Sequence, residues 1–502
     1  MKVDDIHTAH QLCSLRSIFL CGVWLAFLSG CQPEEPEAEV ELSPVARATN
    51  RPDIVLISID SLRYDHLGSY GYPRQTSPTM DAIAAEGMRF EHAVSTTSWT
   101  LPSHAAMFTG LYDSTHGVFD NGHHLRDSFV TLAEVLRDAG YETAGFYGGP
   151  YLHPTFGLDQ GFDTYTSCMT RIPDSLSDQE IRESAQTTRA ESHADITGPR
   201  TSQKVREWLQ TISGRPFFLF LHMWDVHYDY IPPERYVNFF DPDYEGNLDS
   251  RGFTTNGRIN ADMPERDFQH LLALYDGEIR FTDDILAQIF AALDQVGRFD
   301  DALIVITADH GEEFFEHGRK GHHRTLFDEV IRIPLIIRWP GKLAAGRVIQ
   351  DQVRIIDLMP TLLSLAGIDA PQSGKQGRDL SPLMRGESLA SEPALAELLL
   401  NDGNMRALRN NQEKLISYGG QRFRYYDLTA DSREQNPLPH DNERFLRAER
   451  SLRAITDSAL SLGDQMSRDN RSDTVLDPAV CRRLRALGYL DSDADCEISV
   501  EQ

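Results

Sequence analysis

The sequence predicts an α/β fold in which a mostly parallel sheet is sandwiched by helices, followed by a smaller C-terminal α+β domain. Between residue 51 and about residue 366, short apolar and β-branched runs alternate with amphipathic stretches of helical spacing. The runs are almost continuously apolar, as expected for strands that are buried on both faces. Strands that alternate with helices are typical of a parallel sheet covered by helices on both sides.

Five apolar runs are the expected strands of this sheet. In chain order they read RPDIVLISID, GYETAGFYGG, RPFFLFLHMWDVH, DALIVITADHG and IPLIIRWPG. The expected helices include SPTMDAIAAEGM, FVTLAEVLRDAG and IRFTDDILAQIFAALDQVG, and each has a glycine at or beside its end, where glycine commonly terminates helices. We therefore expect residues 51–366 to form the first and larger domain.

The pattern changes beyond residue 367. The stretch ALRNNQEKLISYGGQRFRYYDLTADSREQNPL indicates two or three antiparallel strands with turns, and DNERFLRAERSLRAITDSALSL has the spacing of an amphipathic helix. Residues 367–502 are therefore predicted to form the smaller domain, packed on the first.

The first 50 residues are not expected to belong to the fold. The apolar run SIFLCGVWLAFL follows Arg16 and leads into LSGC, which is the pattern of a signal peptide with small residues at its cleavage region. LSGC resembles the lipobox of bacterial lipoproteins, which implies cleavage before Cys31 and acylation of Cys31. A plain secretory signal or a short anchor helix is the alternative. We expect a signal peptide over 1–30, an acidic Pro/Glu-rich tether over 31–50, and a lipid-anchored protein outside the cytoplasm of a bacterial cell, facing the periplasm or on the outer membrane.

The net charge limits the possible binding partners, and the cysteine content limits the possible disulfides. Acidic residues outnumber basic ones 76 to 48, for a formal charge of -28, which argues against nucleic acid as a partner. An anionic substrate must then be held by local charge or by metal. Of the six cysteines, only Cys168, Cys481 and Cys496 remain after signal removal and acylation. Cys481 and Cys496 could pair in an oxidising compartment, and Cys168 is expected to stay free.

Polar residues follow three of the expected strands. Asp60 comes after IVLIS, Asp225 and His227 come after FFLFLHMW, and Asp309 and His310 come after LIVITA. Ligands of parallel sheets bind just beyond the carboxyl ends of the strands. One such residue would be an ordinary cap or turn residue, but three strand ends in one sheet favour a metal site.

The segment STTSWTLPSHAAMFTG is predicted to be a loop that leads into a helix, and two explanations fit its hydroxyl side chains. Ser and Thr commonly cap helix starts, and Pro102 suits a first turn. Alternatively, one hydroxyl is a nucleophile at the positive end of the helix, where an anionic substrate would be held.

Five ordered blocks resemble the sulfatase family of the alkaline phosphatase superfamily. They read DIVLISIDSLRYDHLGSYGY, TLPSHAAMFTG, TADHGEEFFEHG, GHHRTLFDEVIRIPLIIRWPG and YYDLTADSREQNPL, and the resemblance extends from about residue 51 to residue 490. It implies an alkaline phosphatase-like fold and a hydrolase of sulfate esters, or of chemically similar phosphate esters, at a divalent-metal site.

The resemblance also implies a set of metal ligands. Asp60 stands at the place of a metal-binding aspartate, and Ser61 replaces the acidic ligand that often follows it. Asp309 and His310 stand at the other ligand pair, where many sulfatases have Asp and Asn. One divalent ion is therefore expected, Ca²⁺ or Mg²⁺ as in the family, with Mn²⁺ or Zn²⁺ as alternatives because of the imidazole.

The nucleophile block departs from the family. Sulfatases convert a Cys or Ser, two residues before a proline, to formylglycine, and Thr100 and His104 stand here at the Cys/Ser place and at the place of the family's Arg. Threonine cannot give that aldehyde, so formylglycine is not expected. Nucleotide phosphodiesterases and phosphoethanolamine transferases of the superfamily use an unmodified Thr beside metal, so Thr100 is the predicted nucleophile. Ser103 is expected to cap the helix instead.

The resemblance also implies roles for histidines and basic residues outside these blocks of ligands and nucleophile. His227 matches a histidine that contacts substrate oxygens, and His322 is the predicted proton donor to the leaving oxygen, with His323 and Lys320 as close alternatives. Arg63 could help to neutralise the site, although an arginine after a strand is more often in a structural ion pair. His104 is expected to contact substrate, and His153 is a further candidate.

Two functions are compatible with these residues. The first is an exported sulfatase-family hydrolase acting on a small-molecule or glycan ester of sulfate or phosphate, including phosphodiesterase or phosphonate monoester hydrolase activity with the Thr nucleophile. The second is an inactive, sulfatase-like binding protein for a sulfated ligand, which Ser61, Thr100 and His104 would favour. The retained histidines and aspartates favour the hydrolase.

Overall fold

The computed structural model describes residues 42–45, 50–120, 122–170, 193, 195–371, 376–399 and 403–469. The predicted signal peptide, Cys31, most of the tether, Cys481 and Cys496 lie outside these residues. Within the described part of the chain, no helix is both long enough and apolar enough to cross a membrane. Cys168 is buried and unpaired, as expected.

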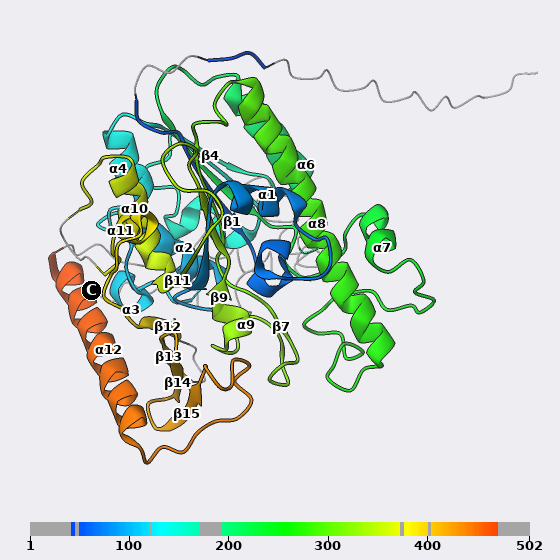
Figure 1. The fold of residues 1–502 in the computed structure, drawn as a ribbon, viewed down its shortest axis with the longest axis vertical. Coiled ribbons are helices and arrows are strands. Elements are labelled where there is room, and N and C mark those ends of the chain that lie inside the picture. The colour runs from blue at the N-terminus through cyan, green and yellow to red at the C-terminus, as the bar shows by residue number, and fades with distance from the viewer. Residues whose placement is uncertain are drawn as a thin grey trace, which may run out of the picture. The chain divides into compact units, whose positions relative to one another are not determined.

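A nine-stranded sheet forms the centre of the fold, with its strands in the order β11-β2-β10-β6-β1-β5-β3-β4 and with β9 paired to β2 (Figure 1). Most pairings are parallel, and β10 is antiparallel to both of its neighbours. The predicted α/β class is therefore confirmed. The strands are β1 Ile54–Ile59, β2 Met88–Val94, β3 Glu142–Tyr147, β4 Thr164–Ser167, β5 Phe217–Met223, β6 Leu303–Ala308, β9 Arg332–Ile333, β10 Leu335–Arg338 and β11 Arg347–Arg354.

The middle of the sheet lies in the hydrophobic core. Every residue of β1, β5 and β6 is buried, which is why these strands are apolar without alternation. β1 pairs in parallel with both β5 and β6, and Ile59 stands opposite Met223 and Ala308 at the same level. The chain therefore leaves these three neighbouring strands at one edge of the sheet.

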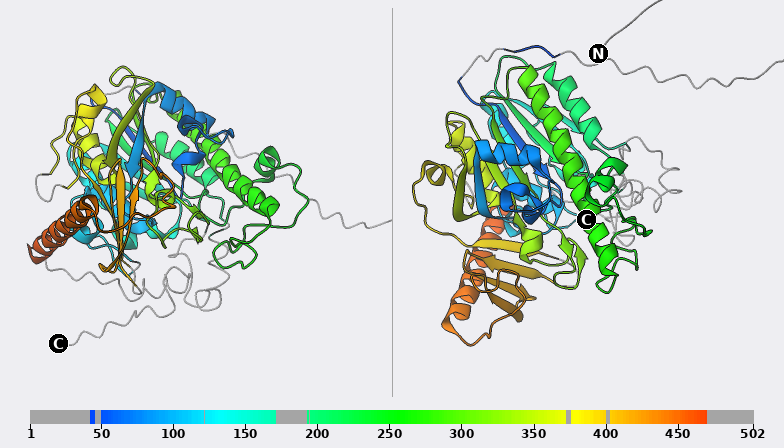
Figure 2. Two further views of the ribbon diagram at one scale, coloured as in Figure 1. Left: turned by 60° about the horizontal axis from the view of Figure 1, so that its bottom comes forward. Right: turned by 45° about the vertical axis from the view of Figure 1, so that its right-hand side comes forward.

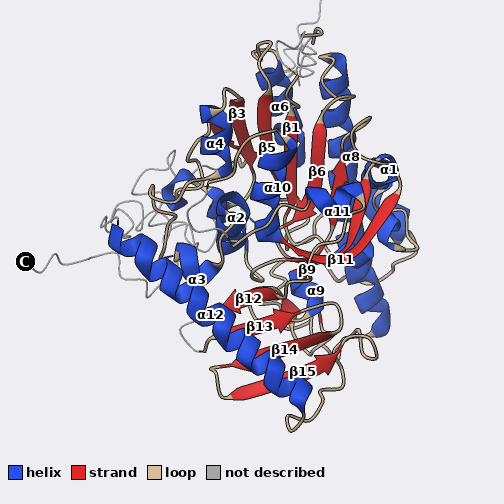
Figure 3. Ribbon diagram, turned by 60° about the vertical axis from the view of Figure 1, so that its left-hand side comes forward, coloured by secondary structure: helices blue, strands red, loops and turns tan. Residues whose placement is uncertain are grey.

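Helices cover both faces of this sheet. α1, α6 and α8 lie on one face, and α2, α4 and α10 lie on the other (Figures 1 and 3). The helices are α1 Pro78–Glu86, α2 Thr100–Thr109, α3 Asp113–His116, α4 Leu132–Asp138, α6 Gly198–Leu209, α7 Glu234–Phe240, α8 Glu265–Gln295, α9 Asp328–Ile331, α10 Leu358–Leu365, α11 Ser381–Arg385 and α12 Glu443–Asp469. Short 3-10 turns occur at Tyr64–His66, Gly68–Tyr70, Pro150–Leu152, Pro154–Phe156 and Ile355–Asp357.

The helix α8 begins well before the stretch IRFTDDILAQIFAALDQVG that the sequence indicated. Gly277 lies inside it, where glycine usually weakens a helix. A Cβ at Gly277 would lie 2.8 Å from Cγ of Pro232, so the glycine lets the segment before α7 pack closely against α8.

The C-terminal part forms a four-stranded antiparallel sheet with α12 packed along it (Figures 2 and 3). Its strands are β12 Ala394–Leu398, β13 Met405–Arg409, β14 Glu413–Tyr418 and β15 Arg422–Asp427, and a separate two-stranded ribbon joins β7 Glu313–Phe314 to β8 Lys320–Gly321. The predicted α+β character is confirmed, with one strand more than the sequence indicated. Buried ion pairs from Arg409 and Lys414 to Asp328 connect this sheet to α9.

Candidate active site

Asp60, Asp309 and His310 lie together beyond the carboxyl ends of β1 and β6. The parallel pairing of these strands brings the three side chains to the same sheet edge, as expected for ligand sites in such sheets. Nε2 of His310 lies 3.7 Å from Oδ1 of Asp60 and 3.6 Å from Oδ2 of Asp309. All three side chains are fully buried.

The chemistry of this cluster fits a divalent cation. Nδ1 of His310 lies 2.9 Å from the carbonyl oxygen of Gly311, which can only accept, so the Nε2 lone pair faces the carboxylates. Oδ2 of Asp309 is buried without a hydrogen-bond partner among the described residues. Burial raises the pKa of Asp60 to about 6. Two buried carboxylates and one imidazole with free lone pairs are a ligand set, and a cation would offset the cost of burying their charge.

Ser61 supports this cluster at the place where the family often has a second carboxylate. Its hydroxyl donates to Oδ1 of Asp60 at 2.8 Å, and its backbone N–H donates to Oδ1 of Asp309 at 3.3 Å. Its φ of +56° lies in the left-handed region, which is uncommon outside glycine and clusters at functional sites. Ser61 therefore positions both aspartates.

Thr100 is the first residue of α2, and its hydroxyl points at the same cluster. Oγ1 lies 3.4 Å from Oδ2 of Asp60 and 3.3 Å from Nε2 of His310. Trp99 occupies the N-cap position and makes no side-chain cap. The hydroxyl is thus free of a capping role and lies where the ligands converge.

Ser103 does not cap α2, so that expectation is wrong. It lies inside the helix, and its hydroxyl donates to the backbone carbonyl of Asp309 at 2.8 Å. This bond holds the first turn of α2 against the end of β6.

His227 and His322 lie beside His310. The ring centroid of His322 is 4.3 Å from that of His310 and 5.0 Å from that of His227. Nδ1 of His322 lies 3.0 Å from Oε1 of Glu312, and the ring of His227 stacks on Trp224 at 3.9 Å. The structure thus brings both predicted histidines next to the cluster.

Burial sets the protonation states of Glu312, His322 and His227. It raises the pKa of Glu312 to about 8, while burial and then the charge of Arg324 lower the pKa of His322 to about 3. Burial also lowers the pKa of His227 well below its usual range. Both histidines are therefore neutral at neutral pH. Glu312 is then mainly protonated and donates to Nδ1 of His322, which leaves the ring proton of His322 on Nε2. Nδ1 of His227 donates to the carbonyl oxygen of Tyr228, which leaves a lone pair on its Nε2.

Two of the cationic residues that the sequence placed in substrate binding have other contacts. Arg63 pairs with Asp65 at 2.8 Å and with Glu316, and Lys320 donates to the carbonyl oxygen of Asn256 at 2.9 Å. These contacts are structural because the charges are already matched to acidic side chains or loop carbonyls.

His104, also expected to contact substrate, is fully buried and has partners for both ring nitrogens within the protein. Nδ1 lies 2.8 Å from the carbonyl oxygen of Thr100, and Nε2 lies 3.0 Å from the hydroxyl of Ser58. Neither nitrogen is left for a substrate oxygen. His104 therefore stabilises the start of α2 from within the protein interior.

His323 and His153 were the remaining candidate histidines, and only His323 is partly exposed. His323 is half-buried, its N–H donates to the carbonyl of Ser98 at 2.9 Å, and its ring stacks on Trp99 at 4.4 Å. This places it beside the start of α2 and next to His322. Nδ1 of His153 accepts from the N–H of Thr155 at 3.2 Å and caps a short turn.

Three further residues at or beside the site were not singled out from the sequence. Glu312 contacts His322, and Arg324 lies exposed two positions after His322 in the sequence. His222 in β5 lies with Nε2 3.4 Å from Oδ2 of Asp60. The sequence feature that could have revealed His222 is its position as a polar residue inside the otherwise apolar run FFLFLHMW. Asp225, which follows that run, instead accepts from the N–H of Thr197 at 2.7 Å and serves the loop before α6.

Comparisons with known proteins agree with this geometry. Residues 52–368 match the family described as Sulfatase, and residues 316–454 match the one described as N-sulphoglucosamine sulphohydrolase, C-terminal. The chain is 26% identical over 445 residues to the ulvan-active sulfatase of Formosa agariphila, which covers 84% of this chain and 83% of that protein.

Two solved structures share the fold. A protein in complex with its substrate D-glucosamine-2-N,6-O-disulfate gives a TM-score of 0.66 at 21% identity, covering 84% of this chain and 100% of that one. The phosphonate monoester hydrolase of Agrobacterium radiobacter gives 0.65 at 23% identity, covering 83% and 96%. The fold is that of the alkaline phosphatase superfamily. Because the family match covers more than half of the chain, the protein belongs to the sulfatase family of hydrolases.

Proposed function

We propose that the protein hydrolyses esters of phosphate or sulfate at a divalent-metal site, with the unmodified hydroxyl of Thr100 as the nucleophile. The observation that carries this proposal is the position of Thr100 Oγ1, which lies within hydrogen-bonding distance of both Asp60 and His310. A hydroxyl next to metal ligands at a helix start is placed to attack an anion that the same site holds.

Asp60, Asp309 and His310 would hold the ion. Such an ion, when bound, lowers the pKa of an adjacent hydroxyl and screens the charge that develops on nonbridging oxygens. The family resemblance favours Ca²⁺ or Mg²⁺, whereas the imidazole of His310 favours Mn²⁺ or Zn²⁺.

Each side chain of the site has a separate role in the proposed reaction. Oγ1 of Thr100 gives its proton to Oδ2 of Asp60 and bonds to phosphorus or sulfur as the bond to the leaving oxygen breaks. His322 gives the leaving oxygen the proton on Nε2, and the protonated carboxyl of Glu312 replaces it by giving its own proton to Nδ1. Glu312 holds Nδ1 of His322 and so orients its Nε2. His323, whose Nε2 has no hydrogen-bond partner among the described residues, can donate to a nonbridging oxygen. Nδ1 of His227 donates to the carbonyl oxygen of Tyr228, so its Nε2 can only accept. Water then cleaves the Thr100 ester and restores the hydroxyl.

Thr100 favours a phosphate ester over a sulfate ester. A threonine hydroxyl that attacks directly leaves a threonine ester that water must cleave at phosphorus or sulfur, whereas a hydrated aldehyde can expel its sulfate by reforming the carbonyl. A sulfate ester is the second candidate, because this chain belongs to the sulfatase family and resembles an ulvan-active sulfatase. The structural likeness to a phosphonate monoester hydrolase supports the first candidate.

A turnover screen tests the proposal. Purified protein, stripped of metal and reloaded with Ca²⁺, Mg²⁺, Mn²⁺ or Zn²⁺, is incubated with an aryl phosphate, an aryl phosphodiester, an aryl phosphonate and an aryl sulfate. We expect metal-dependent turnover, fastest with one of the phosphorus esters. Turnover of the sulfate alone would reverse the order of the two candidates. Binding of a sulfated glycan without any turnover would overturn the proposal and favour a binding protein.

We further propose that the protein is exported and anchored to the bacterial cell envelope by acylation of Cys31. The support is the sequence LSGC behind a short apolar run, followed by an acidic segment suited to be a tether.

A further inference from the structure

His222 and His310 have the same arrangement on neighbouring elements of the site. Nδ1 of His222 lies 2.7 Å from the carbonyl oxygen of Gly148, as Nδ1 of His310 lies 2.9 Å from that of Gly311. A carbonyl oxygen only accepts, so in each ring Nδ1 carries the proton and Nε2 presents a lone pair. An imidazole held through its other nitrogen by a backbone carbonyl is the usual form of a metal ligand.

The backbone of Gly148 is shaped for this contact. A Cβ at Gly148 would lie 2.4 Å from Cβ of Trp224, the residue that follows β5 by one position. Only glycine lets the end of β3 approach β5 closely enough there. Its carbonyl then reaches His222, so the ring orientation is set by the fold.

The lone pair of His222 faces other acceptors and no donor. Nε2 is fully buried without a hydrogen-bond partner among the described residues, and so is Oδ2 of Asp309. Nε2 lies 3.4 Å from Oδ2 of Asp60, and a ligand atom of His222 lies within 4.8 Å of one of Asp309. Buried acceptors that face one another without a donor are unfavourable unless a cation lies between them.

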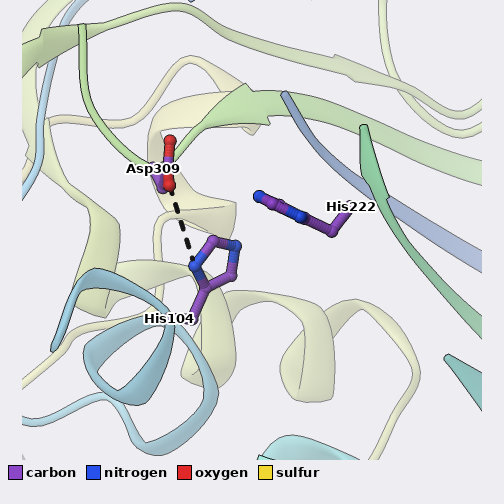
Figure 4. A group of neighbouring side chains, drawn as sticks. All are labelled: His104, His222 and Asp309. Atoms are coloured by element: carbon purple, nitrogen blue, oxygen red, sulfur yellow. Dashed lines mark ion pairs between the residues drawn. The ribbon is translucent and has the colours of Figure 1, made fainter. Parts of the chain in front are cut away.

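His104 lies beside His222 and Asp309, with Nδ1 3.9 Å from Oδ2 of Asp309, but has a different role (Figure 4). Its ring centroid lies 4.9 Å from that of His222, and the two are equally buried. Both nitrogens of His104 already have hydrogen-bond partners in Thr100 and Ser58, so it has no lone pair to offer the cluster. It is therefore a matched control for His222.

We propose that His222 is a fourth protein ligand of the metal ion, together with Asp60, Asp309 and His310. The inference rests on the metal site of the proposed function and adds a residue to it. Two carboxylates and two imidazoles suit Zn²⁺, which prefers four nitrogen or oxygen ligands, and suit Ca²⁺ poorly, because Ca²⁺ takes six to eight oxygens. The protein should thus select Zn²⁺ over Ca²⁺.

Metal titration of variants tests this assignment without substrate. Full-chain protein is stripped with a chelator and titrated calorimetrically with Zn²⁺ alone and with Ca²⁺ alone. We expect His222→Leu to weaken Zn²⁺ binding by at least about 100-fold, the upper end of the loss that even an outer-shell partner causes. His104→Leu should weaken Zn²⁺ binding by no more than about 10-fold, the lower end of the loss for an outer-shell neighbour, since it removes no ligand. Equal Zn²⁺ affinity in wild type and His222→Leu overturns the proposal.

X-ray absorption at the zinc edge gives an answer that does not depend on a folded variant. Zinc-loaded wild-type protein should show two imidazole ligands, whereas one imidazole, or no bound zinc, overturns the assignment. One imidazole would mean that His222 stays outside the coordination sphere of the metal. Two imidazoles in a protein without hydrolase activity would support His222 as a ligand and contradict the proposed function. One imidazole in an active enzyme would contradict His222 as a ligand and support the proposed function.

Discussion

The hydroxyl of Thr100 lies 3.4 Å from Oδ2 of Asp60, although the two residues are 40 positions apart in the chain. Asp60 follows the central strand β1, and Thr100 begins a helix on one face of the same sheet. A nucleophile and a carboxylate that meet at a strand end and a helix start are held by two rigid elements, which keeps their separation constant.

Replacing Thr100 by alanine should remove most of the activity and keep the metal. Turnover of the best substrate is expected to fall at least several hundredfold, or roughly 4 kcal/mol at about 1.4 kcal/mol per tenfold, because the attacking atom is lost. Metal content, measured by atomic emission, should change little. Thr100→Ser keeps the hydroxyl and should retain part of the activity.

Mass spectrometry of the peptide that contains Thr100 is a second check on this residue. The native peptide should carry unmodified threonine, or a phosphoryl or sulfuryl adduct after rapid acid trapping, and never an aldehyde. Wild-type activity in Thr100→Ala would mean that water or another hydroxyl attacks.

Asp309→Asn should lower the metal content and abolish activity, because one carboxylate ligand loses its charge. The fold should persist, since the site lies at the sheet edge and the apolar core is untouched. Asp225→Asn is the control: Asp225 also follows a strand but accepts from Thr197, so its variant should keep its metal. Full activity of metal-free wild-type protein would contradict the assignment.

His322→Gln should lower kcat/KM more strongly for substrates whose leaving alcohol has a higher pKa. A nitrophenyl ester needs little proton donation and should lose less than about tenfold, whereas an alkyl ester should lose the roughly 100-fold or more that general acid catalysis provides. The measurement is a plot of log kcat/KM against leaving-group pKa, which should be steeper for the variant. Parallel plots for the variant and wild type would exclude His322 as the proton donor.

Asp225 should make the protein less stable as the pH rises through the mildly acidic range. Burial raises the pKa of Asp225 from 3.8 to about 6, so the folded state binds this proton more tightly than the unfolded state. Its contribution is fully present below pH 3.8 and lost as the pH rises through about 6, a change of about 3 kcal/mol. The free energy of unfolding in urea should be higher at pH 4 than at pH 7 because of this proton, and in Asp225→Asn the difference between the two pH values should shrink by most of this amount. An unchanged difference would rule out the buried proton.

Cys31→Ser should release the protein from the membrane fraction and abolish labelling by a fatty-acid probe. The reason is that acylation requires the thiol of Cys31 and the amino group that cleavage exposes. The measurement is fractionation of cells grown with the probe. Wild-type protein that is unlabelled and soluble in the periplasm would show that the export signal carries no lipid.

Much of the site could be predicted because it depends on local patterns and one rule of sheet geometry. The runs before Asp60 and Asp309 are apolar enough to mark buried strands, and parallel strands bring the residues at their carboxyl ends to one edge. The helix start at Thr100 was indicated by the proline and the hydroxyls around it. The number of strands was harder to predict. The first half of α8 and five strands of the two larger sheets were missed, namely β2, β4, β9, β11 and β12, because their apolar residues only stand out once their partners are known.

The amino-acid sequence was sufficient for the class of fold, the family, and the group of Asp60, Thr100, Asp309 and His310, because these depend on periodicity and on motifs of a few neighbouring residues. The roles of Ser103, Arg63 and His104 depended on the folded chain. Each of these side chains forms hydrogen bonds or ion pairs with atoms that include partners far away in the sequence. For the same reason, only the folded chain shows that the lone pair of His222 faces Asp60, since the carbonyl that orients its ring comes from a residue 74 positions earlier, at the end of a different strand.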